Sequence, residues 1–354
     1  MKNIDIYNLL PEEIDQVIEK LKQALCIVKG RKNTNSKVVD NLKLVKECPN
    51  CHGMNIVKNG HDKNKVQTYQ CKDCKKKFNA CNNTLIAHMK LTYEQLEIFF
   101  DCMNNKLSIR KTAAKMKVNP NTVFLLRHKV LDCLAEIRED IKLKGVVEAD
   151  EIYESINLKG TKINNMPRFS KPRSSKGGSK RGISNHQVCI ASAIDEYDNF
   201  FFEIVGTGPI TSQEVKTTFQ KKINDVKIFV TDCKSSYEDF IQTSEIKLEQ
   251  VKSKTYKNEN GFSLGNINSL HSEWSTFVAC FKGVSTKHLQ HYLDWFCFQK
   301  IINYTVEILK QPLTMMKQII VNKSNVISNN VYDNSSGINF DVVYSDYNYP
   351  SLTI

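Results

Sequence analysis

The 354-residue sequence predicts a multidomain fold, in which a small cysteine-rich module and an all-helical region precede an α/β domain whose mixed sheet is flanked by helices. Three observations predict this class. Two Cys-x₂-Cys pairs lie between residues 48 and 74, apolar residues recur with helical spacing from 92 to 141, and short β-rich runs begin at residue 145. Strands followed by alternating strands and helices are typical of a layered α/β domain.

Changes in residue pattern divide the chain into five segments. They are an N-terminal helix and linker at 1–40, the cysteine-rich module at 41–88, the helical region at 89–144, the α/β domain at 145–310 and a C-terminal extension at 311–354. The first helix is expected from residue 11 to 29, before the linker "GRKNTNSK". In the α/β domain we expect strands in "GVVEADEIY", "HQVCIASAI", "NFFFEIVG" and "VKIFVTD", with helices near 212 to 223 and from about 265.

The composition is that of a globular protein with a polyanionic partner. It contains 41% apolar and 25% charged residues, and the net charge of +12 favours a partner of opposite charge. We expect no transmembrane helix, because no run of ~18 apolar residues occurs, and no secretory signal, because the N-terminus lacks an apolar core. We therefore expect a cytoplasmic protein whose twelve cysteines are mostly reduced, so that paired cysteines indicate a metal before a disulfide.

The two Cys-x₂-Cys pairs predict a structural Zn²⁺ site. Its expected ligands are Cys48, Cys51, Cys71 and Cys74. Four thiolates at ~2.3 Å complete a tetrahedral shell and leave no open position, and binding of the ion would supply folding energy that the few apolar residues here cannot. The alternatives are four unrelated buried cysteines, or substitution by a nearby ligand. Those nearby candidates are His52, His61 and Cys81.

The same module is basic, which suits contact with phosphate. Nine Lys and three acidic residues lie between 41 and 80. Lys side chains at this density favour binding to a nucleic-acid backbone. A charged face that only contacts solvent is the alternative.

A helix-turn-helix is predicted from 107 to 134, in "LSIRKTAAKMKVNPNTVFLLRHKVLDCL". The segment "KVNPNT" reads as a turn, and Asn121 or Thr122 could cap the helix that follows. The apolar stripe of that helix leaves four residues facing solvent, as expected of a helix that reads DNA. They are Asn121, Arg127, His128 and Lys129. A helical hairpin that contacts no DNA is the alternative.

Carboxylates and an amide from three separate stretches form a candidate catalytic cluster. Strand alternation puts Glu148 and Asp150 on one face, and Asp232 ends an apolar run where ligands of α/β sheets are usually placed. Asn268 and His271 share one face of a later helix at ~100° per residue. Oxygen ligands could hold two divalent ions for in-line phosphoryl transfer. The alternative is that the Asp residues cap loops and that His271 packs in a core.

These motifs resemble bacterial insertion-sequence transposases that join a zinc ribbon, a helix-turn-helix and an RNase H-like DDE-type domain. More narrowly, the chain resembles the ISXO2-like group, in which the third catalytic position is often Asn. The resemblance covers roughly residues 45 to 300, and its most specific stretch is "NINSLHSEWSTFVACFKGVSTKHLQHYLDWF". It implies that Asp150, Asp232 and Asn268 bind Mg²⁺ or Mn²⁺, with His271 as a further catalytic residue. One departure is Ser275, where a Lys is common in the family.

The resemblance implies a transposase that binds the inverted repeats of an insertion sequence, cleaves DNA and joins the freed 3′ end to target DNA. We expect it to act in the cytoplasm, associated with the nucleoid, as a homodimer or larger assembly on DNA. The basic loop at 158 to 182 is expected to contact DNA through Arg168, Arg173, Lys180 and Arg181. The alternatives are a catalytically decayed DNA-binding regulator and a hydrolytic nuclease of the same fold.

Overall fold

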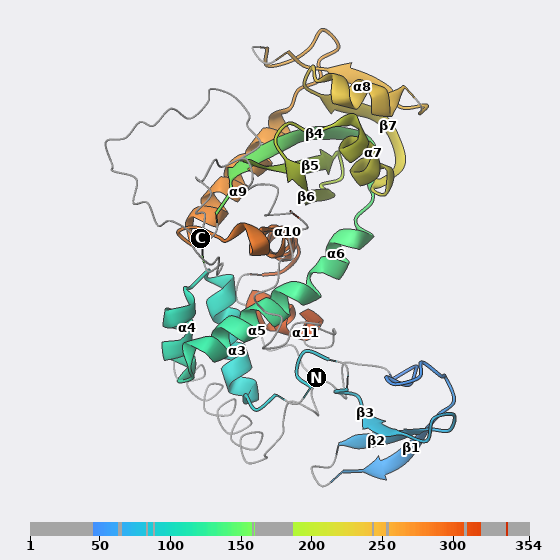
Figure 1. The fold of residues 1–354 in the computed structure, drawn as a ribbon, viewed down its shortest axis with the longest axis vertical. Helices are drawn as coiled ribbons and strands as arrows, with labels where there is room; N and C mark the ends of the chain where they lie inside the picture. The colour runs from blue at the N-terminus through green and yellow to red at the C-terminus, as the bar shows by residue number, and fades with distance from the viewer. Residues whose placement is uncertain are drawn as a thin grey trace, which may run out of the picture. The chain divides into compact units, whose positions relative to one another are not determined.

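The computed structural model divides into two compact units, each described by itself (Figure 1). The first comprises Met1–Asn105, Ala114–Lys117 and Pro312–Ser324, and the second Lys106–Ala113, Val118–Gln311 and Asn325–Ile354. The structure describes residues 45–62, 66–82, 84–87, 89–157, 159, 187–242, 244–252, 255–307, 310–319 and 338. The predicted helix at 11–29 and the predicted DNA contacts Arg168, Arg173, Lys180 and Arg181 lie outside these residues.

The first unit contains a small antiparallel sheet in the order β1-β2-β3. Its strands are β1 (Ile56–His61), β2 (Gln67–Cys71) and β3 (Lys77–Asn79). A longer helix, α3 (Tyr93–Asn104), follows. It begins at a capping box, in which the Thr92 hydroxyl accepts from the Gln95 N–H and the Gln95 side chain accepts from the Thr92 N–H. Leu96, Phe99 and Phe100 make its buried face.

The predicted helical region is confirmed. After α3 come α4 (Ile109–Met116), α5 (Pro120–Cys133) and α6 (Ala135–Asp140). Helix α4 ends because Lys117 adopts a φ of 55°, so that the Val118 N–H can bond the Ala113 carbonyl at 3.1 Å. The Asn119 side chain accepts from the Asn121 N–H and caps α5, whose first residue is Pro120. The predicted cap at Asn121 or Thr122 is therefore wrong by two residues or more.

The second unit contains a five-stranded mixed sheet in the order β6-β5-β4-β7-β8. Its strands are β4 (Leu143–Ser155), β5 (Gln187–Asp195), β6 (Phe200–Thr207), β7 (Ile223–Thr231) and β8 (Lys247–Gln250). β4, β5 and β6 pair antiparallel, whereas β7 and β8 run parallel to β4. The four predicted strands are confirmed, and β8 is an element that the sequence did not indicate.

Helices cover both faces of this sheet (Figure 1). They are α7 (Ser212–Gln220) and α8 (Ser235–Ile241) on one face, and α9 (Gly265–Ala279) and α10 (Leu289–Thr305) on the other, with a 3₁₀ turn η2 (Thr286–His288) before α10. Phe219 of α7 packs against Phe201 and Phe229 of the sheet, while Trp274 of α9 and Phe296 of α10 pack against Phe202.

Two details of the helices differ from expectation. Helix α7 ends at Gln220, short of the predicted residue 223, because Ile223 already begins β7. The short helix α8 was not predicted, whereas α11 (Gln311–Ile319) lies in the stretch expected to be helical from about residue 265. Within the described part of the chain, every helix is too short or too polar to cross a membrane.

Candidate active site and nucleic-acid interface

Two acidic residues of β4 hold helix α9 in place. The buried Glu148 carboxylate accepts hydrogen bonds from the N–H groups of Asn266 and Ile267, at 2.9 and 3.0 Å, and from the Asn266 side chain at 2.7 Å. These N–H groups belong to the first turn of α9, where a helix has free donors and a positive dipole end. Glu154 accepts from the Trp274 indole at 3.0 Å, two turns further along α9. Glu148 and Glu154 therefore hold α9 against β4 at two points, one at the start of the helix and one about two turns later.

The other two acidic residues of β4 meet Asp232 around one ammonium group. Lys234 Nζ lies 3.8 Å from Asp150 Oδ1 and 3.2 Å from Asp232 Oδ2, and it also forms an ion pair with Glu151. Asp232 follows the last residue of β7, which pairs in parallel with β4, so both strands deliver a carboxylate to the same place. The predicted approach of Asp150 and Asp232 is therefore supported by their shared contact with Lys234.

Burial and neighbouring charges have opposing effects on pKa values in the acid site, which consists of Asp150, Glu151, Asp232 and Lys234. Desolvation raises the pKa of Asp150 to about 6, although the Glu151 N–H and the Lys234 ammonium lower it in part. Burial alone would lower the pKa of Lys234, but Glu151 and the two Asp residues outweigh it and raise that pKa above its ordinary value. The site thus concentrates negative charge that requires a cation.

His271 reaches the acid site through a serine. Its Nε2 lies 2.7 Å from Ser192 Oγ, and that hydroxyl donates to the Asp150 carbonyl oxygen at 2.7 Å. Ser192 stands directly opposite Asp150 in the register of β4 and β5. Burial, followed by the charge of Lys234, lowers the pKa of His271 to about 4, so the ring is neutral near pH 7.

Asn268, the third predicted metal ligand, lies on α9. It is exposed on α9, one residue after Ile267, which binds Glu148, and three residues before His271. Its helix is therefore tied to β4 on both sides of it. Ser275, the departure from the family pattern, is exposed and bonds the His271 carbonyl at 3.0 Å within the helix.

Sequence reasoning missed two residues of this site. Lys234 follows Asp232 by two positions, yet a lysine near acidic residues is too common on surfaces to single it out. Ser192 could be found only from the strand register, which pairs it with Asp150. Glu148, in turn, anchors α9 through Asn266, which lies 118 residues later in the chain, so no local pattern could indicate this role.

The four cysteines of the first unit converge. Their Sγ atoms all lie within 4.8 Å of one another, and the Cys48–Cys74 and Cys51–Cys71 pairs are each 3.6 Å apart. Ligand sulfurs around a tetrahedral Zn²⁺ are about 3.8 Å apart. All four are free thiols, so the cluster could hold a metal as predicted.

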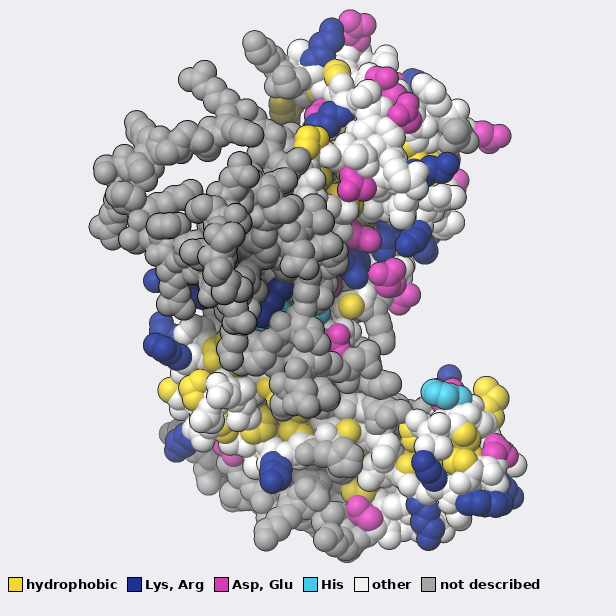
Figure 2. Space-filling view, viewed as in Figure 1, with side chains coloured by type: hydrophobic (Ala, Val, Ile, Leu, Met, Phe, Trp, Pro, Cys, Tyr) yellow, Lys and Arg dark blue, Asp and Glu magenta, His cyan; other side chains and the backbone are white. Residues whose placement is uncertain are grey.

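In both Cys-x₂-Cys turns, the residue that follows the second cysteine has a positive φ angle. His52 and Lys75, each directly after the second cysteine of its pair, have φ values of 58° and 61°. Gly53 allows a close approach, because a Cβ there would lie 2.3 Å from the Asp73 carboxylate. Around the cluster, basic and apolar side chains lie side by side on the visible face of the module (Figure 2). Exposed lysines of this module are Lys46, Lys58, Lys72, Lys75, Lys76 and Lys77.

Two predicted DNA contacts of the helix-turn-helix are not on the surface. Arg127 is 2% and His128 is 3% exposed, so the prediction that they face solvent is wrong. The Arg127 guanidinium donates to the Leu107 carbonyl at 2.7 Å and lies 5.5 Å from the Trp295 ring centre. Helix α10 covers this side of α5, which the helical pattern of α5 alone could not indicate. Asn121 is exposed and Lys129 is half-buried.

Comparison with known proteins gives one informative similarity. A Halobacterium salinarum protein, described as an uncharacterized protein in the transposable element ISH50, is 24% identical over 275 residues, which cover 75% of this chain and 86% of that protein. No protein-family model matches the chain.

Solved structures give only weak similarity. A pre-cleavage Mos1 transpososome has a TM-score of 0.20 at 11% identity, covering 64% of this chain and 78% of that one. A Mos1 mariner paired-end complex with Mn has a TM-score of 0.24 at 12% identity, covering 62% and 75%. TM-scores this low do not support a shared fold.

Proposed function

We propose that the protein is a DNA transposase that binds the inverted repeats of an insertion sequence, cleaves DNA and transfers the freed 3′ end. One observation carries the proposal: Asp150 and Asp232 meet at adjacent parallel strands, and His271 of α9 is linked to the Asp150 carbonyl through Ser192. The similarity to a protein of a transposable element supports it. So does the mixed sheet between two helical layers, which agrees with an RNase H-like domain.

The acid site has the chemistry to bind Mg²⁺ or Mn²⁺. Asp232 Oδ1 and Glu151 Oε1 are buried without a hydrogen-bond partner, which leaves acceptor oxygens free for a cation. Asp150, Asp232 and Asn268 offer the oxygen ligands that these hard ions prefer. Bound divalent ions would activate the attacking oxygen and stabilise the leaving one in phosphoryl transfer.

The chain's own residues have distinct tasks in this proposal. Asp150 and Asp232 hold the ions, and Glu148 keeps α9 in register so that Asn268 stays beside them. Lys234 balances the acidic charge until divalent ions replace it. His271, neutral near pH 7, positions the Asp150 strand through Ser192 and can accept a proton at Nδ1.

The cysteine-rich module and the helix-turn-helix would recognise the DNA. A Zn²⁺ ion held by Cys48, Cys51, Cys71 and Cys74 would stabilise the small sheet, whose exposed lysines suit phosphate contact. Asn121 lies exposed in the first turn of α5, the position from which a helix-turn-helix reads base edges. These assignments make end binding independent of the acid site.

The test uses purified full-length protein, Mg²⁺ or Mn²⁺, and labelled duplexes that carry the element's ends. Asp150→Ala and Asp232→Ala should each retain end binding in a gel-shift assay but lose cleavage and joining. Glu245→Ala, which removes an exposed carboxylate between α8 and β8, is the matched control. Cleavage at the wild-type rate in either Asp variant would remove that residue from the mechanism.

Other outcomes identify the rival functions. Nicking without transfer of a 3′ end to target DNA would indicate a hydrolytic nuclease. End binding by the wild type with neither cleavage nor joining would indicate a DNA-binding regulator whose catalytic domain has decayed.

A further inference from the structure

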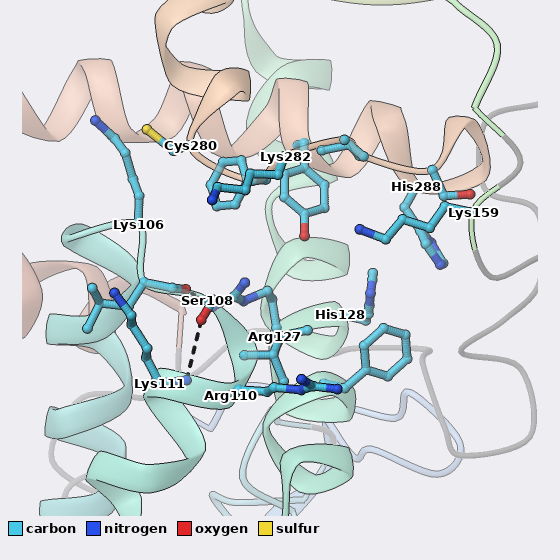
Figure 3. Close-up of a pocket in the computed structure, with 18 of the residues that line it drawn as sticks. Lys106, Ser108, Arg110, Lys111, Arg127, His128, Lys159, Cys280, Lys282 and His288 are labelled. Carbon is cyan, nitrogen blue, oxygen red and sulfur yellow. Dashed lines mark hydrogen bonds between the residues drawn. The ribbon is translucent and has the colours of Figure 1, made fainter. Parts of the chain in front are cut away.

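A second metal-binding cluster lies away from both the cysteines and the acid site. His128 of α5, His288 at the end of η2 and His291 in the first turn of α10 come together in the second unit, each with a ligand nitrogen within 4.8 Å of the others. All three are buried, with exposures of 3%, 7% and 9%. Figure 3 shows His128 and His288 approaching each other from different segments.

The nitrogen atoms of this cluster lack hydrogen-bond partners. His128 Nδ1, both nitrogens of His288 and His291 Nδ1 are buried and unbonded. Buried polar atoms in folded proteins almost always have a partner, because leaving them unpaired costs free energy. Four unpaired ring nitrogens in one place therefore point to a partner that binds several of them at once.

Ring packing does not explain these nitrogens. The His128 and His288 ring centres are 4.1 Å apart, and Phe124 packs on His128 at 4.5 Å. Any aromatic ring could make such contacts, and a Phe would do so without unpaired polar atoms. Burial also lowers the pKa of His128 to about 2 and that of His288 to about 3, which keeps the rings in the neutral form that binds metals.

We propose that His128, His288 and His291 bind one Zn²⁺ ion that joins α5 to α10. Three imidazoles suit Zn²⁺ and related transition metals, whereas Mg²⁺ and Ca²⁺ prefer oxygen ligands. A tetrahedral Zn²⁺ needs ligand nitrogens about 3.4 Å apart, and those of this cluster lie within 4.8 Å of one another. The ion is distinct from the divalent ions of the acid site and from the ion of the cysteine cluster.

The fourth ligand comes from an adjoining cavity. His128 and His288 line a cavity of about 700 Å³ that also contains Lys106, Arg110 and Lys282 (Figure 3). None of the described residues that line it is acidic. A solvent-derived ligand, preferably hydroxide, completes the shell there, because its negative charge offsets the neighbouring cations Arg127 and Lys287 that oppose binding of a dication.

The position of the site gives it a structural role. α5 would carry the DNA-reading turn, and η2 and α10 belong to the layer that supports α9. An ion that bridges them would fix the reading helix to the catalytic fold, and its binding would stabilise the second unit. This role does not depend on the protein being a transposase.

Cobalt titration of the full-length protein separates the two transition-metal sites. Excess Mg²⁺ in the buffer keeps Co²⁺ from the acid site. The wild type should bind two Co²⁺ ions, one with the strong thiolate charge-transfer band of the cysteine cluster and one with only visible d–d bands of a nitrogen site. Cys71→Ser should lose the thiolate band and keep the second ion, while His291→Gln and His288→Gln should lose the second ion and keep the thiolate band.

His61→Gln is the matched control, because this histidine is exposed at the end of β1 and should leave both ions bound. Zinc content after equilibrium dialysis should fall from two ions per chain to one in either His variant. One ion per metal-saturated wild-type chain, or Cys71→Ser protein without any d–d band, would overturn the proposal even if the His variants fail to fold. Retention of the second ion in both His variants would overturn it as well.

Discussion

The ring of His271 and the hydroxyl of Ser192 form a hydrogen bond of 2.7 Å between Nε2 and Oγ. The Ser192 proton is already donated to the Asp150 carbonyl, which can only accept. Ser192 Oγ must therefore accept from His271, so the neutral ring carries its proton on Nε2 and a lone pair on Nδ1. The tautomer follows from the network, and it leaves Nδ1 as the basic atom of this ring.

Ser192→Ala should slow cleavage because it removes the group that sets this tautomer. The Asp150 carbonyl and the His271 N–H would both lose a buried partner, each worth about 1–3 kcal/mol, so we expect cleavage to fall roughly 10- to 100-fold with end binding unchanged. Single-turnover cleavage measures the rate, and ¹⁵N shifts of the His271 ring report the tautomer. Thr276→Ala, on the exposed side of α9, is the control. Unaltered ring shifts would contradict the assignment.

Lys234→Gln should destabilise the metal-free protein and increase its response to divalent ions. Removing the ammonium leaves Glu151, whose side chain is fully buried, without its ion-pair partner. Breaking a buried pair costs about 3–5 kcal/mol, and roughly 2–4 kcal/mol is expected here because the Lys234 side chain is 30% exposed. Thermal melts with and without Mg²⁺ should show a larger stabilisation by Mg²⁺ in the variant than in the wild type.

The control for Lys234 is Lys247→Gln. Lys247 pairs with Glu249 but is 64% exposed, so its loss should cost less than about 1 kcal/mol. If Lys234→Gln had the same melting temperature as the wild type, and Mg²⁺ raised both melting temperatures equally, the Lys234 ammonium would not occupy the position of a bound cation.

Local pattern indicated only part of the acid site. Alternation along one strand placed Glu148 and Asp150 on one face, and the end of an apolar run indicated Asp232. The choice of Asp150 and Asp232 as metal ligands came from the family resemblance and stays a prediction. The role of Glu148 was out of reach, because its partners are the first N–H groups of a helix whose start depends on the tertiary fold. Strand β8 was missed because its sequence, KLEQ, is short and polar.

In the helix-turn-helix, the local pattern led to a wrong prediction of which residues face solvent. A helical stripe predicts one buried face, which assumes that the other face meets solvent. Helix α5 is instead packed by α10 as well, so Arg127 and His128 are buried on the side that the stripe assigned to solvent. Only the tertiary fold could place His288 and His291 beside His128, because they come from a segment about 160 residues away.

Asp294→Asn should stabilise the protein increasingly as the pH rises from 5 to 8. Burial raises the pKa of Asp294 to about 6, and its ion pair with Arg138 at 3.7 Å compensates only in part. A raised carboxyl pKa means that its stabilising contribution is complete below the unfolded pKa of about 3.9 and is lost as the pH rises through about 6. The gain at pH 8 should approach roughly 3 kcal/mol.

Urea unfolding at several pH values measures this trend. The asparagine can still accept from Gln290, which donates to Asp294 Oδ1 at 2.9 Å, so the packing should be preserved. Asp140→Asn, an exposed change at the end of α6, controls for the altered net charge. A stability difference between Asp294→Asn and wild type that is constant from pH 5 to 8 would show that folding does not raise the pKa of Asp294.

Glu148→Ala should impair catalysis through the position of α9, although Glu148 binds no substrate in our proposal. The change leaves the N–H groups of Asn266 and Ile267 without an acceptor at the positive end of α9. We expect a loss of about 2–4 kcal/mol of stability and a larger fall in cleavage than in end binding, because Asn268 follows these residues directly. Glu154→Ala removes the acceptor of one bond, from Trp274, and should have a smaller effect on both. If Glu148→Ala cleaved DNA at the wild-type rate, the start of α9 would not need its tie to β4 for catalysis, and Asn268 would lose its proposed place beside the metal ions.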